Sequence, residues 1–457
     1  MTRSEKSLPT LSVAEASAML IGIVVGIGIF KTPIMVAANS SSDAVFIGLW
    51  IAGGLLMMVG ALCYAELGSA HPNAGGEYHY LNLAYGRLPG FLFAWGRISV
   101  MQSGAIAAVA FAYGDYAATL IPLGPAGAAL HGAIAIAALA ILQLLGTGPS
   151  GRGQLVLTVM TVALVLVMAL CAFLAGPAPA ESALPESKAA GSAGLALVFI
   201  LLTYGGWNET AYLTGELKDA KRNLIRVLML GTGFVTLLYV IVNLALLGAF
   251  GLEGLRQQSV LTEPVGRVLG TAGSVVVGLA VCTAALSTLN ATMFTGARTI
   301  YALGQDFPPF SALGQRSAKS GTPVNAILAQ AAIVLGLIAL GSNARDGFSA
   351  MVEYTAPVFW GFLLLIGLSL FIFRGRERGR EPSFRVPLYP LTPLIFCATC
   401  LYLLYASLVH TGTGALVGVA VLAVGVPLYF LGTAGRTLPA PEKPGAHPER
   451  GRYMPGE

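Results

Sequence analysis

The feature that most constrains this chain is a series of long apolar runs separated by short polar segments. Of its 457 residues, 56% are hydrophobic and only 10% are charged. A run of roughly 20 apolar residues is long enough to cross the hydrocarbon core of a membrane as a helix. Twelve runs meet this condition: 12 to 37, 44 to 66, 91 to 121, 128 to 147, 154 to 175, 192 to 216, 226 to 250, 270 to 301, 324 to 341, 349 to 373, 388 to 409 and 413 to 433. We therefore expect an all-α polytopic membrane protein with twelve transmembrane helices.

The basic residues are unevenly divided between the two sides of the expected membrane. If the amino terminus is cytoplasmic, the outer side keeps only Lys31, Lys188, Arg256, Arg267 and Arg345 of the 26 basic residues. Because positive charge collects on the cytoplasmic side, this bias predicts that both termini are cytoplasmic. The expected location is a plasma membrane of the bacterial inner type. The first run has no cleavage site after a short apolar core and is expected to be a retained helix. The net charge of +5 then reflects topology and contact with membrane lipid, and no nucleic-acid partner is expected.

The first apolar run carries three glycines within seven residues, Gly22, Gly26 and Gly28. Glycine lowers helix propensity, and a helix that breaks at membrane depth leaves unpaired backbone groups that must face a cavity or a ligand. The N–H groups of one half-helix and the C=O groups of the other suit the carboxylate and the ammonium of an amino acid. The alternative is that Gly22 and Gly26 form a Gly-x-x-x-Gly packing face between intact helices.

A second break is expected in the sixth run, where Gly205 and Gly206 lie about 180 residues after the first break. The same offset relates the interrupted segments 71–90 and 251–270. Five helices followed by five predict two repeats of opposite orientation, with their breaks near the bilayer midplane. The expected organisation is a cytoplasmic amino terminus (1–11), a first repeat (12–175), a second repeat (192–373), two further helices (388–433) and a disordered cytoplasmic tail (437–457).

Five motifs, in order, resemble those of the amino acid, polyamine and organocation (APC) superfamily, and in particular its L-type amino acid transporter branch. Residues 26 to 33 are similar to its Gly-Ser-Gly-Ile-Phe signature, and residues 60 to 81, GALCYAELGSAHPNAGGEYHYL, resemble its second helix and first inner loop. Residues 203 to 226, 295 to 309 and 383 to 395 resemble its sixth helix, the exit of its eighth helix and the entry to its eleventh. The resemblance implies the LeuT-like five-plus-five inverted repeat with two appended helices.

The resemblance also implies a substrate site made mostly of backbone. Its carboxylate site falls on the N–H groups of Gly26, Ile27 and Gly28, and its ammonium site falls on carbonyls of both broken helices: Ile23, Val24, Leu202, Thr203 and Gly205. The side chains expected to shape the pocket are Tyr204 and Trp207, with Met101, Gln102 and Ser103 of the third run, and core packing is the alternative for each.

Three departures from the family pattern bear on mechanism. Ile27 replaces the serine of Gly-Ser-Gly, which leaves only backbone donors. Leu202 stands where many L-type members carry an aromatic lid. Counting from Gln154 places Thr161 where L-type members carry a lysine whose ammonium stands in for a sodium ion. A Na⁺ ion is then expected to have oxygen ligands available: Gly22, Val25, Thr161, Ser287 and Thr288. The alternative is that Ser287 and Thr288 bond back to their own helix.

Two glutamates within or beside the runs receive separate hypotheses, because ionisable groups in membrane spans are costly. Glu209 lies just beyond the second break and is a candidate for exchanging a proton or contacting substrate. Glu66 is expected to pair with Arg87, Arg97 or Arg298 near the inner membrane face. Glu353 and Asp115 are weaker candidates of the same kind.

These observations predict a secondary active transporter of amino acids, most simply small neutral ones, that works by alternating access as a symporter or an exchanger. Na⁺ or H⁺ is the candidate coupling ion. A cationic amino acid or polyamine transporter is the alternative substrate class, and a non-transporting amino acid receptor is the alternative of a different class. No enzyme activity is expected, because none of the five histidines is paired within a span. The resemblance also bears on partners, because some L-type members pair with a glycoprotein through a cysteine in the outer loop between the third and fourth helices. The corresponding loop, 121–128, has no cysteine, so no disulfide-linked heavy chain is expected.

Overall fold

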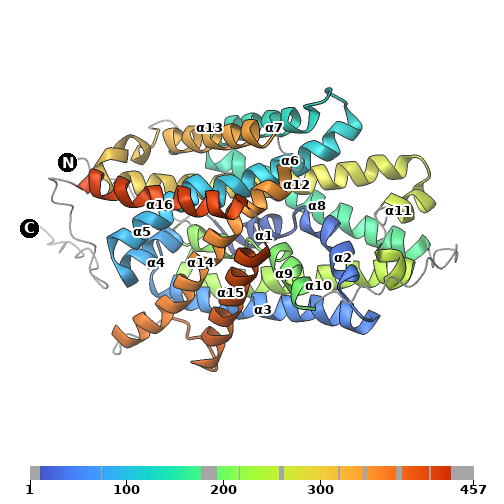
Figure 1. Ribbon diagram of the computed structural model, residues 1–457, viewed down its shortest axis with the longest axis horizontal. Helices are drawn as coiled ribbons and strands as arrows, with labels where there is room; N and C mark the ends of the chain where they lie inside the picture. The colour runs from blue at the N-terminus through green and yellow to red at the C-terminus, as the bar shows by residue number, and fades with distance from the viewer. Residues whose placement is uncertain are drawn as a thin grey trace, which may run out of the picture.

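The computed structural model describes residues 11–73, 75–175, 193–215, 217–256, 262–317, 320–342, 347–376, 383–410 and 413–433. Within these ranges the chain is helical and contains no sheet, and one isolated β-bridge joins Leu11 to Leu217. The tail 437–457 and most of the expected amino-terminal segment 1–11 lie outside the described residues. Figure 1 shows an elongated helical bundle with α4 and α5 at one end and α2 and α11 at the other.

The helices follow one another in this order: α1 (Val13–Val24), α2 (Gly28–Ala38), α3 (Asp43–Ala70), α4 (Gly76–Tyr85), α5 (Arg87–Gly96), η1 (Arg97–Met101), α6 (Gln102–Leu120), α7 (Gly127–Leu144), α8 (Thr147–Ala175), α9 (Ala193–Thr203), η2 (Trp207–Leu213), α10 (Ala220–Leu255), α11 (Thr262–Leu269), α12 (Ala272–Asp306), η3 (Pro308–Gly314), α13 (Val324–Gly341), α14 (Gly347–Arg376), α15 (Leu391–His410) and α16 (Thr413–Thr433).

Ten helices in the described part of the chain are long and apolar enough to cross a membrane. One of them is the continuous stretch α5–η1–α6, in which η1 is a π-helical turn. The two remaining apolar runs, the first and the sixth, are each divided into two short helices. The break between α1 and α2 covers residues 25 to 27, and the break between α9 and η2 covers residues 204 to 206. Both predicted interruptions of the helices are confirmed.

The two broken helices lie beside each other in the bundle. α1 packs against α8, α10, α12 and η2, whereas α2 packs against α9 and α10. The first half of each broken helix therefore contacts the second half of the other, as in an antiparallel pair. α1 begins with a capping box in which the Ser12 hydroxyl and the Glu15 carboxylate satisfy each other's backbone N–H groups. Its other end has no such cap and stops at the glycines.

Candidate functional site

The start of α2 presents backbone donors at the first break. The Gly26 N–H is already used, because it donates to the Val24 carbonyl at 2.8 Å in a tight turn. Within the described part of the chain, no hydrogen bond uses the N–H of Ile27 or Gly28. These two donors lie at a helix amino terminus, where the aligned peptide dipoles favour negative charge. Of the three N–H groups expected to bind a carboxylate, two have no hydrogen-bond partner in the described part of the chain.

The carbonyl end of α1 is held by hydroxyl groups from two other helices. The Tyr239 hydroxyl of α10 donates to the Val24 carbonyl at 2.7 Å. The Thr288 hydroxyl of α12 lies 3.2 Å from the Gly22 carbonyl and 3.3 Å from that of Ile23, and the Ser287 hydroxyl lies 3.3 Å from Gly22. The alternative that Ser287 and Thr288 only bond back to their own helix is therefore wrong. Their hydroxyls reach across to α1.

The second break is pressed directly against the first. Gly206 has φ +105°, and a Cβ there would lie 2.5 Å from Cγ2 of Ile23. A Cβ on Gly28 would lie 2.8 Å from Cγ2 of Thr203. The hydroxyls of Thr32 and Thr203 also join α2 to α9, at 2.5 Å. The glycines thus serve both to interrupt the helices and to let the two interruptions touch.

The Gly-x-x-x-Gly alternative is correct in part. A Cβ on Gly22 would lie 2.3 Å from side-chain atoms of Gln154 and Thr158, and one on Gly26 would lie 2.7 Å from the Thr288 hydroxyl. Gly22 and Gly26 therefore form a close packing face for α8 and α12. That face exists in a helix that is nevertheless broken.

The aromatic side chains next to the second break point into the core formed with α3. Tyr204 is buried, donates its hydroxyl to the Trp50 carbonyl at 3.1 Å and packs with its ring against Trp50 and Tyr239. Trp207 packs edge-on against Tyr64 at 4.9 Å. These contacts favour a packing role for both side chains over the expected pocket role. The Leu202 side chain, in contrast, is 38% exposed.

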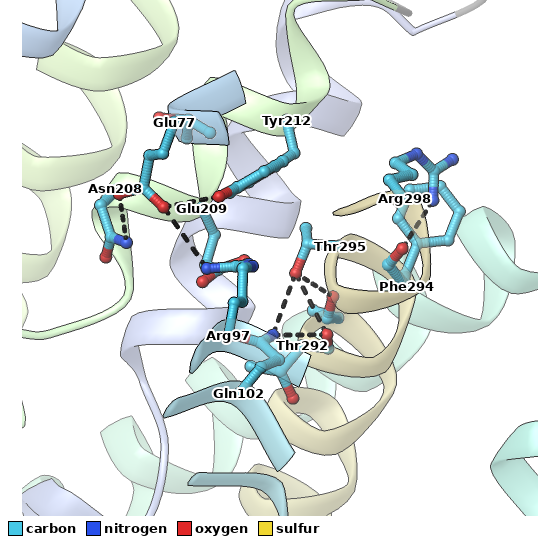
Figure 2. Close-up of polar contacts among 12 residues, drawn as sticks. Glu77, Arg97, Gln102, Asn208, Glu209, Tyr212, Thr292, Phe294, Thr295 and Arg298 are labelled. Carbon is cyan, nitrogen blue, oxygen red and sulfur yellow. Dashed lines mark hydrogen bonds and ion pairs between the residues drawn. The ribbon is translucent and has the colours of Figure 1, made fainter. Parts of the chain in front are cut away.

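The expected residues of the third run lie in or beside the π-helical turn η1. Ser103 donates to the Ile98 carbonyl at 2.5 Å within its own helix, and Met101 is buried. Gln102 reaches α12, where its amide nitrogen lies 2.6 Å from the Thr292 carbonyl and 3.4 Å from the Thr295 hydroxyl (Figure 2). The structure thus ties Gln102 to a neighbouring helix.

A cluster of uncharged polar groups lies where the candidate Na⁺ site was expected. The Gln154 amide nitrogen lies 2.9 Å from the Ser287 hydroxyl and 3.1 Å from that of Thr158, and Thr158 donates to the Ala18 carbonyl at 3.1 Å. Thr161, the residue chosen from the sequence, is buried one turn further along, and its hydroxyl forms no hydrogen bond with another described residue. Thr158, and not Thr161, is the α8 hydroxyl that contacts α1.

Just after the second break in the chain, η2 takes part in a buried network of three charged side chains. Arg97 of η1 contacts Glu209 of η2 at 2.6 Å and Glu77 of α4 at 3.4 Å, and all three side chains are buried (Figure 2). Glu77 also accepts hydrogen bonds from Asn208 at 3.1 Å, from Tyr212 at 2.7 Å and from Tyr64. Burial raises the pKa of the Glu77 carboxyl above its usual value, and the Arg97 guanidinium acts in the opposite direction.

The family model described as "Amino acid permease" matches residues 11–431. The chain belongs to this family. It is a multi-span transporter of the amino acid permease type and not an enzyme, and the resemblance read from its five motifs is confirmed.

Curated relatives cover most of the permease. The chain is 30% identical over 424 residues to the b(0,+)-type amino acid transporter 1 of Mus musculus, which covers 90% of this chain and 85% of the relative. It is 27% identical over 426 residues to the serine/threonine exchanger SteT of Bacillus subtilis, covering 91% and 94%. It is 28% identical over 442 residues to the large neutral amino acids transporter small subunit 2 of Oryctolagus cuniculus, covering 92% and 80%.

One predicted ion pair of the permease is wrong. Glu66 pairs with Arg374 of α14, whose Nε and Nη2 lie 2.7 Å and 2.5 Å from the two carboxylate oxygens, and it also accepts from the Val386 N–H at 2.6 Å. Arg97, one of the partners considered from the sequence, contacts Glu77 and Glu209 instead. The Arg374 side chain comes from the last turn of α14.

Sequence reasoning also missed Glu77, Tyr239, Gln154 and Thr158 as contacts of the broken helices. Glu77 had a signal, because it is an acidic residue inside the amphipathic segment between two apolar runs. The other three are polar residues within long apolar helices, and the neighbours that they contact depend on how those helices pack. Among the described residues, no group of three or more His, Cys, Asp or Glu side chains is placed to hold a metal ion.

Proposed function

We propose that this permease moves small neutral amino acids across the membrane by alternating access, with the substrate zwitterion held between the two helix breaks. The observation that supports this most directly is the pair of N–H groups on Ile27 and Gly28, which lie next to the carbonyl end of α1. A carboxylate suits the donors and an ammonium suits the carbonyls. Gly26 contributes its backbone shape to this site, while the carbonyls of Ile23, Val24, Leu202, Thr203 and Gly205 remain the proposed ammonium ligands.

We also propose how the helices are arranged in repeats and how the permease is oriented in the membrane. The antiparallel contact of the two broken helices supports two repeats of five helices in opposite orientation, followed by α15 and α16, which makes twelve spans. The end of the bundle with α4 is then the cytoplasmic side, in accord with the distribution of basic residues. Opening and closing would alternate between this end and the end with α2 and α11.

The preference for neutral substrates rests on where the charged groups point. A cationic side chain would need a carboxylate free to receive it, and Glu209, the acidic residue next to the second break, is already paired with Arg97 at 2.6 Å. The printed names of the relatives, a serine/threonine exchanger and a large neutral amino acids transporter among them, agree with a neutral substrate. Cationic amino acids remain the alternative class to include in the assay.

For coupling we propose obligatory exchange that does not require Na⁺. Gln154 and Thr158 link α8 to α1 and α12 through neutral hydrogen bonds at the position where a cation was considered. The Ser287 hydroxyl is engaged by an amide nitrogen, a donor that cannot ligate a cation, which is an argument against Na⁺ there. Glu209 remains the proposed group for proton exchange if the flux depends on pH.

The test is uptake of radiolabelled serine, leucine and arginine into proteoliposomes. Vesicles are prepared empty or filled with unlabelled amino acid, with or without an imposed Na⁺ or H⁺ gradient. Exchange is supported if uptake requires internal amino acid and ignores Na⁺. Uptake into empty vesicles that follows an ion gradient would establish symport, and saturable binding without any flux would point to a receptor.

A further inference from the structure

Arg97 occupies an unusual backbone position in the described structure. It is the first residue of the π-helical turn η1, inside an otherwise α-helical span. An inserted π turn changes the direction in which side chains leave a helix, and such turns are frequent at functional positions. From this turn the Arg97 side chain reaches two segments that are distant in sequence, α4 and η2.

The half-helix η2 is tied to α4 by side chains. Asn208 and Tyr212 of η2 both donate to Glu77 of α4, and Tyr212 also lies under the Arg97 guanidinium at 4.2 Å (Figure 2). A Cβ on Gly76, where α4 begins with φ +49°, would lie 2.8 Å from the Tyr212 ring. A 3₁₀ helix has poorer internal hydrogen bonds than an α-helix, so contacts of this kind have a large share in fixing where η2 lies.

Arg97 supplies the positive charge of the network, opposite the carboxylates of Glu77 and Glu209. Two buried carboxylates face one guanidinium, so removing the guanidinium would leave two negative groups in a water-poor environment. Burial of an unpaired charge is far more costly than burial of a pair, and the cost disappears if the segment swings open and the carboxylates become hydrated.

We propose that Arg97 is a positioning residue that latches the half-helix η2 against α4, so that the Glu77–Arg97–Glu209 network closes the α4 end of the permease. This inference rests on the proposed function, because alternating access requires the α4 end to open and close during the transport cycle. Opening would exchange the buried contacts for contacts with water. The latch would set the balance between the two states without touching the substrate.

The experiment measures the accessibility of η2 in the full-length purified permease. Ala211 is buried on η2, against the start of α4, and Ala211→Cys provides a thiol that N-ethylmaleimide reaches only when η2 separates from α4. The rate of modification is compared in the parent Ala211→Cys chain and in chains that add Arg97→Gln, Arg97→Lys, Glu209→Gln or the pair Arg97→Gln with Glu209→Gln. Arg222→Gln, which removes an exposed arginine from the start of α10, is the matched control.

The latch predicts an order of rates. Arg97→Gln raises the rate at least about tenfold, because a closed state with two unpaired carboxylates is disfavoured. Arg97→Lys and Glu209→Gln, which each keep a positive charge opposite at least one carboxylate, raise it by about threefold or less. Adding Glu209→Gln to Arg97→Gln returns the rate toward that of the parent, and Arg222→Gln leaves it unchanged.

Equal modification rates in the parent, Arg97→Gln and Glu209→Gln chains would overturn the latch. If Arg97→Gln does not yield folded protein, Glu209→Gln and Arg97→Lys decide the matter, because the latch requires both to accelerate modification relative to Arg222→Gln. The readout uses no substrate, so the two proposals fail separately. If exchange is normal but the modification rate does not depend on Arg97, the latch alone is wrong. If exchange is absent but the rates follow the predicted order, the proposed function alone is wrong.

Discussion

The hydroxyl of Tyr239 donates to the carbonyl of Val24, the last residue of α1, at 2.7 Å. These residues lie 215 positions apart, on helices α10 and α1, and Tyr239 is completely buried. The Val24 carbonyl also accepts from the Gly26 N–H at 2.8 Å, so the Tyr239 hydroxyl is its second donor at the interruption of α1. It also fixes the direction of a group that we propose as an ammonium ligand.

Replacing this tyrosine with phenylalanine should slow transport while keeping the fold. Tyr239→Phe removes one hydrogen bond but retains the ring that packs against Trp50 and Tyr204. The loss of about 1 kcal/mol corresponds to roughly a fivefold decrease in Vmax/KM for amino acid exchange. Tyr405→Phe, at an exposed position, is the control and should behave as the parent. Unaltered exchange by Tyr239→Phe would contradict a role for this contact at the break.

A methyl group at Gly206 should disable the permease. Gly206→Ala would place a Cβ 2.5 Å from Ile23 at φ +105°, where an L residue is strained by roughly 1–3 kcal/mol. Exchange in proteoliposomes is expected to fall at least about tenfold, because the two breaks can no longer touch. Gly361→Ala in α14, where a Cβ meets nothing within 4 Å, serves as the control. It should leave exchange and thermal stability unchanged or slightly improve stability.

The α8 hydroxyls allow a paired prediction within one helix. Thr158→Val removes the bonds to the Ala18 carbonyl and to Gln154, whereas Thr161→Val removes a hydroxyl that has no hydrogen bond in the described structure. We expect Thr158→Val to reduce exchange several-fold, by about 1 kcal/mol, and Thr161→Val to be neutral or stabilising. Transport and melting temperature are measured for both, with and without Na⁺. A larger effect at Thr161, or Na⁺ dependence lost in either variant, would restore the cation site expected from the sequence.

The contrast between these two threonines illustrates what the sequence could and could not supply. Apolar run length and glycine spacing are local properties, so the helical class and both breaks were predictable. The neighbour that a polar residue meets depends on packing: the α8 hydroxyl that bonds to α1 is that of Thr158, three residues before Thr161, the position counted from Gln154. Three residues are nearly one turn, so the two threonines lie on a similar face of α8 at different heights.

Pairing of charges was the least predictable part. Glu66 and Arg374 are 308 residues apart, and nothing in the local sequence distinguishes Arg374 from the other arginines at the inner membrane face. Arg97 was considered as a partner for Glu66 because both belong to the same expected side. Whether Arg97 pairs with Glu66 or with other carboxylates depends on the direction in which the π turn points its side chain. A π turn cannot be recognised from a run of apolar residues in the sequence.

The buried network also predicts that acid favours the closed α4 end. The groups that face Glu77 are Arg97 from η1, Asn208, Glu209 and Tyr212 from η2, Tyr64 from α3, and Tyr80 of α4 itself. Burial raises the pKa of Glu77 in this closed arrangement above its ordinary value, and the carboxyl regains that value when it is hydrated in the open one. A group whose pKa is raised in one state stabilises that state at low pH, and the stabilisation is lost as pH rises through the raised pKa.

Modification of Ala211→Cys should therefore slow as pH falls toward the acidic side of neutrality. Because the thiol itself titrates, the rate is divided by that of Ser311→Cys, an exposed reporter on η3. Glu77→Gln should flatten the normalised profile, since it removes the group whose pKa differs between the two states. If Glu209→Gln flattens the profile while Glu77→Gln preserves it, the proton belongs to Glu209, as the sequence had suggested. A profile that is already flat in the parent chain would mean that the network carries no exchangeable proton, and its role would then be limited to the electrostatic latch.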